Sequence, residues 1–306
     1  MKVLSTPEDR FQDLQEYPFK SHFLKVEDGQ GAKLNMHYLD EGPKQAEVIL
    51  LLHGEPTWSY LYRDMVAGLK NEYRVIAPDL IGFGKSDKFE QREDYTYASH
   101  ISWVKLLLDG LNLSSITMFC QDWGGLIGLR LLAQDPSRFL RVVAANTFLP
   151  TGEGKPSSAF LEWRDFSQNS KSFSISKVIA SGCTKPLSDE ALRAYDAPYP
   201  DESYKAGARA FPALVPIYAD DPEALKNREA WQILKEWKKP FLTAFSDQDP
   251  ITRGGDKLFQ SLIPGCQNQN HTTVQGAGHF LQEDNSAELV DIIDRFIKAN
   301  PRENIV

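Results

Sequence analysis

The stretch Ile116-Thr-Met-Phe-Cys-Gln-Asp-Trp-Gly-Gly125 decides the fold. Its apolar start predicts a buried strand, and the residues after Asp122 have a helical pattern. A tight turn between a strand and a helix exposes one side chain at the top of a sheet, and small residues must stand two positions to either side of it. Gly124 fills one of these positions, and Cys120 stands where a glycine is usual. Asp122 is therefore the candidate nucleophile; the alternative is that it caps the helix and that Gly124 and Gly125 serve close packing.

Apolar runs alternate with helical patterns on both sides of this turn. The apolar runs, typical of strands buried on both faces, lie at 47–52, 73–77, 116–120, 140–145 and 241–245, after an opening pair at 23–26 and 34–39. The helical patterns lie at 58–69, 98–111, 123–133 and 286–299. Strands separated by helices predict an α/β fold with a mostly parallel sheet.

The alternation stops after Pro150 and resumes at Phe241. The segment between them is polar and rich in proline, so short helices fit it better than long strands. An excursion of about 80 residues is too long for a plain loop. We therefore predict a helical cap, residues 151–231, inserted between two parts of an α/β core, residues 1–150 and 232–306.

Composition narrows the class of protein. The chain has 306 residues and a formal charge of −8, which argues against a nucleic-acid partner. We find no apolar run of the ~20 residues that span a membrane, and no signal-peptide pattern at the start. Three cysteines, Cys120, Cys183 and Cys266, are too few for a disulfide framework and lack metal-site spacing. These observations predict a cytoplasmic protein without metal or cofactor.

A second motif, His53-Gly-Glu-Pro56, directly follows a predicted strand. In α/β hydrolases this loop donates one backbone N–H to an oxyanion hole, and the residue after the nucleophile donates the other. Those residues would be Glu55 and Trp123, with Glu55 acting through its backbone because its own charge would oppose an oxyanion. The alternative is a simple turn at the end of a strand.

Two further motifs complete a catalytic order. Ser246-Asp-Gln-Asp-Pro250 follows a strand, and Gly276-Ala-Gly-His-Phe280 precedes the last helix. Nucleophile, acid and histidine then occur in the order of this fold. We expect His279 as the histidine and Asp249 as the acid, because Asp249 lies further past the strand end; Asp247 is expected to form a turn.

An aspartate nucleophile implies a two-step reaction. A carboxylate is ionised near neutral pH and needs no base to attack an sp³ carbon that bears a leaving group. The product is an ester on Asp122, which water activated by His279 must then hydrolyse. Asp249 would orient the imidazole and stabilise the imidazolium, and the oxyanion hole would serve this second step.

The chain resembles the haloalkane dehalogenases of the α/β-hydrolase superfamily, specifically the subfamily I type with a Trp-Trp halide site. The resemblance covers nearly the whole chain and is carried by residues 53–62, 77–87, 121–125 and 277–283, and in the cap by 197–204 and 211–212. It implies an eight-stranded sheet and hydrolysis of haloalkanes to a primary alcohol and halide. It also implies that a small haloalkane and water are the partners, that halide is the product ligand, and that the chain is a monomer or weak oligomer.

The resemblance also implies a halide site and an apolar pocket. Neutral indole N–H groups of Trp123 and, from the cap, Trp163 would bind the leaving halide. The competing tryptophans are Trp58, Trp103, Trp231 and Trp237. The pocket, apolar because haloalkanes offer no hydrogen-bonding group, is predicted to include Leu126, Phe160, Phe211, Pro212, Val215 and Ile251, with ordinary packing as the alternative.

Three other functions stay open. An epoxide hydrolase would use two cap tyrosines as proton donors, for which Tyr195, Tyr199, Tyr204 and Tyr218 are candidates, but its oxyanion loop typically has Gly-Phe-Pro where this chain has Gly-Glu-Pro. A haloacid dehalogenase would need an arginine by the nucleophile, and Arg130 is expected to face away. The third open function is that of a ligand-binding homologue without activity. Repeated halide release from excess substrate would distinguish an enzyme from such a binding protein.

Overall fold

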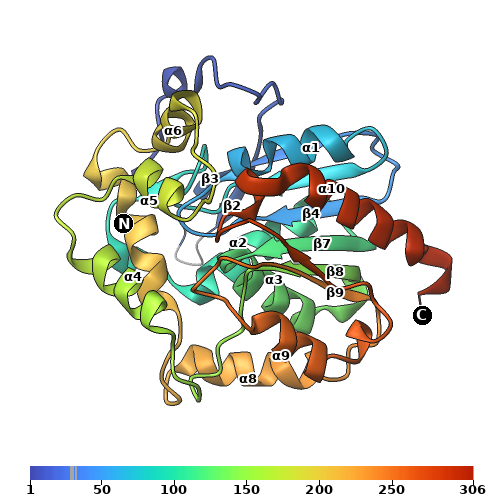
Figure 1. The fold of residues 1–306 in the computed structure, drawn as a ribbon. Coiled ribbons are helices and arrows are strands. Elements are labelled where there is room, and N and C mark those ends of the chain that lie inside the picture. Colours follow the sequence, from blue (N-terminus) through green and yellow to red (C-terminus); the bar gives the residue numbers. More distant parts are fainter. Residues whose placement is uncertain (28–30, 32, 306) are drawn as a thin grey trace.

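A computed structural model describes residues 1–27, 31 and 33–305. Its centre is an eight-stranded sheet with the strand order β10-β9-β8-β7-β4-β5-β3-β2 (Figure 1). The strands are β2 (His22–Glu27), β3 (Lys33–Glu41), β4 (Val48–Leu52), β5 (Arg74–Pro78), β7 (Ile116–Gln121), β8 (Phe139–Ala145), β9 (Phe241–Ser246) and β10 (Thr272–Val274). All pairs from β5 to β10 are parallel, whereas β2 and β3 are antiparallel, so the mostly parallel sheet is confirmed. A separate antiparallel pair joins β1 (Val3–Leu4) to β6 (Lys88–Phe89).

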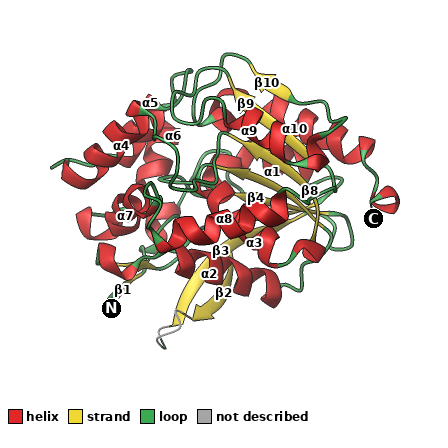
Figure 2. Cartoon of the chain, turned by 90° about the horizontal axis from the view of Figure 1, so that it is seen from below, coloured by secondary structure: helices red, strands yellow, loops and turns green. Residues whose placement is uncertain are grey.

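Helices cover both faces of the sheet (Figures 1 and 2). In Figure 1, α1 (Arg63–Leu69) and α10 (Leu281–Ala299) lie above the strands, and α3 (Trp123–Gln134), α8 (Pro222–Leu234) and α9 (Gly255–Leu262) lie below them, next to α2 (Tyr97–Gly110). The predicted helix 58–69 begins as a 3-10 turn, Ser59–Tyr62, a common start for an α-helix. The predicted helix 286–299 begins five residues earlier, with a non-helical residue at Asn285.

Burial on both faces explains why the central strands are apolar throughout. Leu50, Leu51 and Leu52 of β4 are fully buried, as strands covered by helices on both sides must be. Burial of each such side chain contributes roughly 1.5–3 kcal/mol. The buried centre of the sheet therefore fixes the carboxyl ends of β4 and β7, from which two of the predicted site motifs extend.

The segment after Pro150 forms short helices, as predicted. They are α4 (Ser158–Asn169), α5 (Ile175–Ser181), α6 (Asp189–Asp196) and α7 (Ala206–Leu214), followed by α8. Polar caps begin several of them: the side chain of Ser157 accepts a hydrogen bond from Phe160 N at the start of α4. The predicted limit at residue 231 falls within α8, which also contacts α3. The division into core and cap therefore stays a prediction.

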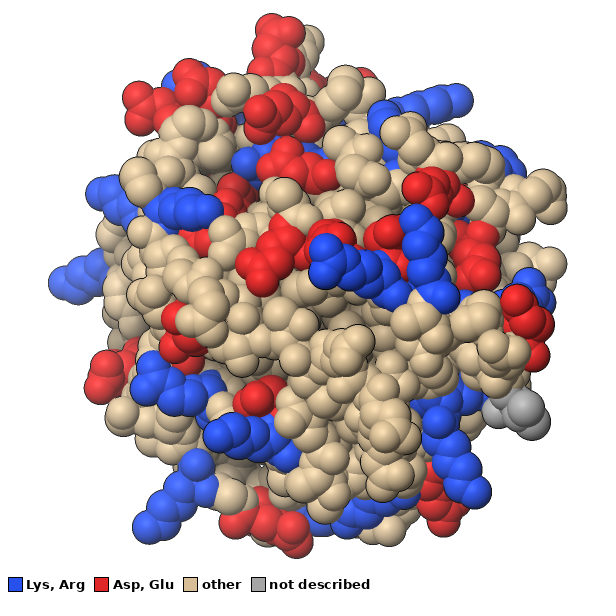
Figure 3. Space-filling view, turned by 45° about the vertical axis from the view of Figure 1, so that its right-hand side comes forward, with Lys and Arg blue, Asp and Glu red and all other residues tan. Residues whose placement is uncertain are grey.

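The described part of the chain contains no helix that is long and apolar enough to cross a membrane. Acidic and basic side chains are interspersed on the face that Figure 3 shows, so the negative net charge is not gathered into one patch there.

Candidate active site

The turn that holds Asp122 is backbone-strained and tightly packed. Asp122 has φ 51° and ψ −126°, a conformation that residues other than glycine rarely adopt and that costs roughly 1–3 kcal/mol. Asp122 N donates to Asn146 O at 3.0 Å, and Thr147 Oγ1 donates to Asp122 O at 2.7 Å. A Cβ at Gly124 would lie 2.0 Å from Leu52 O, so a glycine is required there. The side chain of Asp122 makes no capping bond to α3, which leaves it free to face the cavity.

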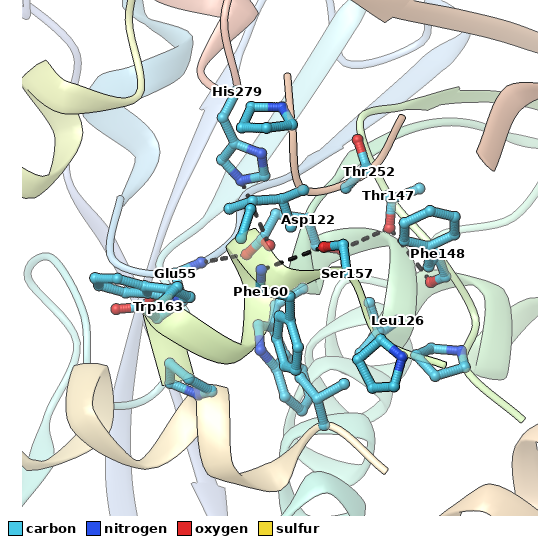
Figure 4. Close-up of a pocket in the computed structure, with 18 of the residues that line it drawn as sticks. Glu55, Asp122, Leu126, Thr147, Phe148, Ser157, Phe160, Trp163, Thr252 and His279 are labelled. Atoms are coloured by element: carbon cyan, nitrogen blue, oxygen red, sulfur yellow. Dashed lines mark hydrogen bonds and ion pairs between the residues drawn. The ribbon is translucent and has the colours of Figure 1, made fainter. Parts of the chain in front are cut away.

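Both oxygens of the Asp122 carboxylate have defined neighbours (Figure 4). Oδ1 accepts a hydrogen bond of 2.8 Å from Glu55 N, in the loop after β4. Oδ2 lies 3.5 Å from His279 Nε2. A Cβ at Gly54 would come within 2.2 Å of Oδ1, so the loop can approach the carboxylate because Gly54 has no side chain. Helix α3 begins at Trp123, so the backbone N–H of Trp123 belongs to a first turn that has no acceptor within the helix.

Asp249, and not Asp247, contacts the histidine. Asp249 Oδ2 lies 3.0 Å from His279 Nδ1. The other contacts of Asp249 come from its own loop, where Ile251 N donates at 2.8 Å and the Thr252 hydroxyl also donates. Asp247 instead accepts a hydrogen bond of 2.9 Å from Gly276 N, which joins two loops as a turn former would. The structure thus brings the three side chains together, with the His279 ring between the carboxylates of Asp122 and Asp249.

Charge coupling shifts the pKa values of this pair in opposite directions. Burial alone would lower the pKa of His279, but Asp249 and Asp122 together raise it to about 10. Burial alone would raise the pKa of Asp249, but the charge of His279 and hydrogen bonds from His279 and Thr252 lower it to about 2. The resting arrangement is therefore an imidazolium between two carboxylates.

The side chain of Glu55 has a role in the site that the sequence did not indicate. It is buried, and its Oε1 has no hydrogen-bond partner among the described residues. Burial raises the pKa of this carboxyl well above its ordinary value and the charge of Asp122 adds to the effect, although His279 and the N–H of Trp163 oppose it. The surroundings of Glu55 therefore favour its neutral form, in which it does not oppose an anion in the site.

Trp123 and Trp163, the two tryptophans that the sequence predicts for the halide site, line the same cavity as Asp122. Trp123 packs edge-on against Tyr97 and Phe211, with ring centroids 4.9 Å and 4.5 Å away. Trp163 comes from α4 and stacks on Phe166 and Phe173. Both indoles are thus held in place by other aromatic rings.

The competing tryptophans are placed differently. Trp231 also lines the cavity, but its indole N–H donates to Leu149 O at 2.8 Å and is not free for a halide. Trp58, Trp103 and Trp237 have buried indole nitrogens and are outside the cavity lining. Within the described chain, Trp123 and Trp163 are therefore the suitable pair.

The cavity has a volume of about 1520 Å³, more than the roughly 300–1,000 Å³ of a typical small-molecule site. Five of the six predicted pocket residues line it, namely Leu126, Phe160, Pro212, Val215 and Ile251. The prediction for Phe211 is wrong: its ring is fully buried between Trp123, Phe83 and His100. Phe211 supports the Trp123 indole from behind, because α7 turns Pro212 and not Phe211 toward the cavity.

The groups that the alternative functions need are placed away from the nucleophile. The four cap tyrosines are absent from the described lining of the cavity. The Tyr195 hydroxyl instead donates a hydrogen bond to the Glu283 carboxylate. Tyr218 is largely exposed to solvent. Arg130 faces Glu223 and Asn227, each at 3.0 Å, as expected for a residue that points away from the site. Residues 1–27, 31 and 33–305 hold no group of three His, Cys, Asp or Glu side chains suited to a metal ion.

Gln121 is a further neighbour of His279 that the sequence reasoning missed. This residue ends β7 and is fully buried. Its Nε2 lies 3.1 Å from His279 Nε2 and 3.2 Å from His279 O. The one sequence signal is its position directly before Asp122, at the carboxyl end of a buried strand.

Comparison with known proteins agrees with this geometry. A sequence profile described as the alpha/beta hydrolase fold matches residues 47–286. A haloalkane dehalogenase of Psychrobacter cryohalolentis is 53% identical over 303 residues, which cover 99% of this chain and 100% of that one. The tetrameric structure of the haloalkane dehalogenase DpaA from Paraglaciecola agarilytica NO2 superposes with a TM-score of 0.88 at 32% identity, covering 96% of this chain and 97% of that one. A cis-3-alkyl-4-alkyloxetan-2-one decarboxylase of Xanthomonas campestris is 31% identical over 93% of this chain and 98% of its own.

Proposed function

The chain belongs to the haloalkane dehalogenases of the alpha/beta hydrolase fold, and we propose that it hydrolyses haloalkanes to a primary alcohol and a halide ion through an ester on Asp122. One observation carries the proposal: the Asp122 carboxylate, His279 and two tryptophans face one cavity, and the carboxylate contacts Glu55 N and His279 Nε2. Such a site can attack a carbon, receive the leaving anion and supply a base for the second step.

In the first step Asp122 displaces the halide. A carboxylate oxygen forms a bond to the halogen-bearing carbon while the carbon–halogen bond breaks and the halide leaves with the electron pair. Indole N–H groups of Trp123 and Trp163 bind the halide without a full positive charge, which lets the ion depart later. The apolar residues Leu126, Phe160, Pro212, Val215 and Ile251 exclude water around the reacting carbon.

In the second step water cleaves the ester. The water oxygen adds to the carboxyl carbon of Asp122 as one of its protons moves to His279 Nε2. Backbone N–H groups of Glu55 and Trp123 stabilise the oxyanion. The bond from this carbon to the alkoxy oxygen then breaks, the alkoxide takes the proton from His279, and the regenerated carboxyl group loses its own proton to solvent.

Loss of the Asp122 charge prepares His279 for this step. Asp122 and Asp249 together raise the pKa of His279 to about 10 in the resting enzyme. An ester carries no charge, so after the first step only Asp249 supports the imidazolium, and His279 loses its Nε2 proton to solvent more readily. The chemistry of the first step thus converts His279 from an acid into a base.

The remaining parts of the proposal concern partners and location. The two steps use protein side chains and water, so we propose that no metal or organic cofactor takes part and that halide is the product ligand. We keep a monomer or weak oligomer as the proposed state; light scattering tests it, and a tetramer, the assembly described for DpaA, would contradict it. We also propose a cytoplasmic location, consistent with three unpaired cysteines.

Halide release is the direct test. With excess 1,2-dibromoethane and 1-bromobutane we expect many equivalents of bromide per enzyme, and no diol from styrene oxide. Diol without bromide would favour an epoxide hydrolase, and at most one equivalent of bromide would favour a binding protein. A cis-3,4-dialkyloxetan-2-one serves as the third substrate, because decarboxylation is the reaction named for the Xanthomonas campestris relative.

A further inference from the structure

The amide of Gln121 lies against the reacting nitrogen of His279. Gln121 is fully buried at the end of β7, and its Nε2 is 3.1 Å from His279 Nε2 and 3.2 Å from His279 O. Its Oε1 is buried without a hydrogen-bond partner among the described residues. An unpartnered buried carbonyl oxygen costs free energy, so some other contact must hold the amide in this orientation.

The backbone carbonyl of His279 determines which end of the amide faces the ring. A glutamine amide can be turned so that its oxygen and nitrogen exchange places. In the turned state Oε1 would lie against His279 O, and two acceptor oxygens that carry no hydrogen cannot bond to each other. The NH₂ group therefore faces His279 O with one hydrogen, and its second hydrogen faces His279 Nε2.

This orientation selects one form of the imidazole. Nε2 can accept a hydrogen from Gln121 only when Nε2 carries no proton of its own. The ring proton must then be on Nδ1, where Asp249 Oδ2 accepts it at 3.0 Å. That form is the neutral tautomer, whose single Nε2 lone pair takes a proton from water once water replaces the Gln121 hydrogen there.

On the basis of the proposed dehalogenase activity, we propose that Gln121 is a positioning residue, whose amide holds His279 in the neutral tautomer during hydrolysis of the ester. Three ionisable groups from three other loops face His279, namely Asp122, Asp249 and Glu55. Asp122 opposes Gln121 in the resting enzyme, since a carboxylate favours an Nε2 proton. Burial raises the pKa of Glu55 and favours its neutral form. Once Asp122 is an uncharged ester, Gln121 therefore acts mainly against Asp249.

The test follows the ester-hydrolysis step as a function of pH. Wild type, Gln121→Met and Gln121→Glu are mixed with 1-bromobutane, quenched at intervals, and the alkyl-enzyme is measured by intact-protein mass spectrometry. Gln282→Met is the matched control, because Gln282 is also buried with an unpartnered Oε1, but it faces Tyr62 and not the histidine ring.

We expect hydrolysis to increase with pH as His279 loses its proton. In Gln121→Met the midpoint of the curve of hydrolysis rate against pH should rise by about one pH unit, because the hydrogen bond that opposes the imidazolium is lost. In Gln121→Glu it should rise further, because a carboxylate would pair with the imidazolium. Gln282→Met should keep the wild-type midpoint even if it unfolds at a lower temperature.

An unchanged midpoint in the Gln121 variants, with a slower plateau, would overturn the proposal and leave Gln121 a packing role. If Gln121→Met does not fold, Gln121→Leu, which also removes the amide without adding a charge, decides by the same criterion. Wild-type enzyme that releases no halide would instead overturn the proposed function, and the two failures are thereby distinguished.

Discussion

Replacing Asp249 with asparagine should separate the two chemical steps. Asp249 is almost fully buried, and its carboxylate lies 3.0 Å from His279 Nδ1. Asparagine has the same shape but no charge, so Asp249→Asn removes the group that orients the imidazole and stabilises the imidazolium. Alkylation of Asp122 does not use this group. We therefore expect one rapid equivalent of halide per enzyme, followed by very slow turnover.

The lowered pKa of Asp249 shows how strongly the folded protein stabilises its charge. Burial alone would raise the pKa of Asp249, but His279 and hydrogen bonds from Thr252 and Ile251 hold it at about 2, against an ordinary 3.8. At about 1.4 kcal/mol per pKa unit, the ionised carboxylate contributes a net stability of roughly 2 kcal/mol. The lowered pKa means that this stability is present above pH ~4 and is lost as the pH falls through about 2. Loss of the triad acid slows catalysis by about 10⁴-fold in a comparable site, and we expect hydrolysis to slow by that order.

Rapid-quench measurement of bromide, with mass spectrometry of the protein, provides the assay. Asp247→Asn is the matched control, because Asp247 also follows β9 but bonds to Gly276 N. The amide oxygen of the asparagine can still accept that hydrogen bond. The activation free energy of turnover should therefore stay within about 0.5 kcal/mol of the wild-type value. Slow turnover in Asp247→Asn with normal turnover in Asp249→Asn would refute our assignment of the acid. Loss of the first bromide equivalent in Asp249→Asn would refute the separation of the steps.

Three more predictions concern the base and the halide site. In His279→Phe the alkyl ester on Asp122 should accumulate, because alkylation needs no base; unmodified protein in the mass spectrum would count against this. Trp163→Phe should weaken halide quenching of tryptophan fluorescence and slow turnover by about 100-fold, by analogy with loss of an oxyanion donor, and the same loss in Trp231→Phe would reverse our choice. Halide affinity should fall as the pH rises through the raised pKa of Glu55, because the carboxylate form repels halide, and Glu55→Gln should remove this pH dependence; an identical profile in both proteins would contradict the explanation.

The parts of the site that depend on local backbone geometry could be predicted from the sequence. The turn at Asp122 is encoded by a buried strand, a small residue on either side and a following helix. Asp249 could be chosen over Asp247 because two extra residues past the strand end extend its reach to the histidine, and the structure has that contact. In each case the determining residues are neighbours along the chain.

Side-chain direction and burial could not be predicted, because they depend on segments far apart in the sequence. Phe211 is an apolar cap residue like Pro212, but contacts with Trp123 and His100 turn its ring away from the cavity. The raised pKa of Glu55 depends on its burial and on the charge of Asp122, and the sequence motif His53-Gly-Glu-Pro56 shows neither. Gln121 contacts His279 although 158 positions of the sequence separate them.

The origin of the alcohol oxygen tests the central claim, a covalent ester on Asp122, most directly. Excess enzyme should convert 1-bromobutane once in H₂¹⁸O, followed by mass analysis of the alcohol and of the peptide that contains Asp122. We predict unlabelled alcohol and one ¹⁸O atom in the Asp122 carboxylate, because the alcohol keeps a carboxylate oxygen and water replaces it. Labelled alcohol with unlabelled Asp122 would mean that water displaces the halide directly, and would contradict the mechanism.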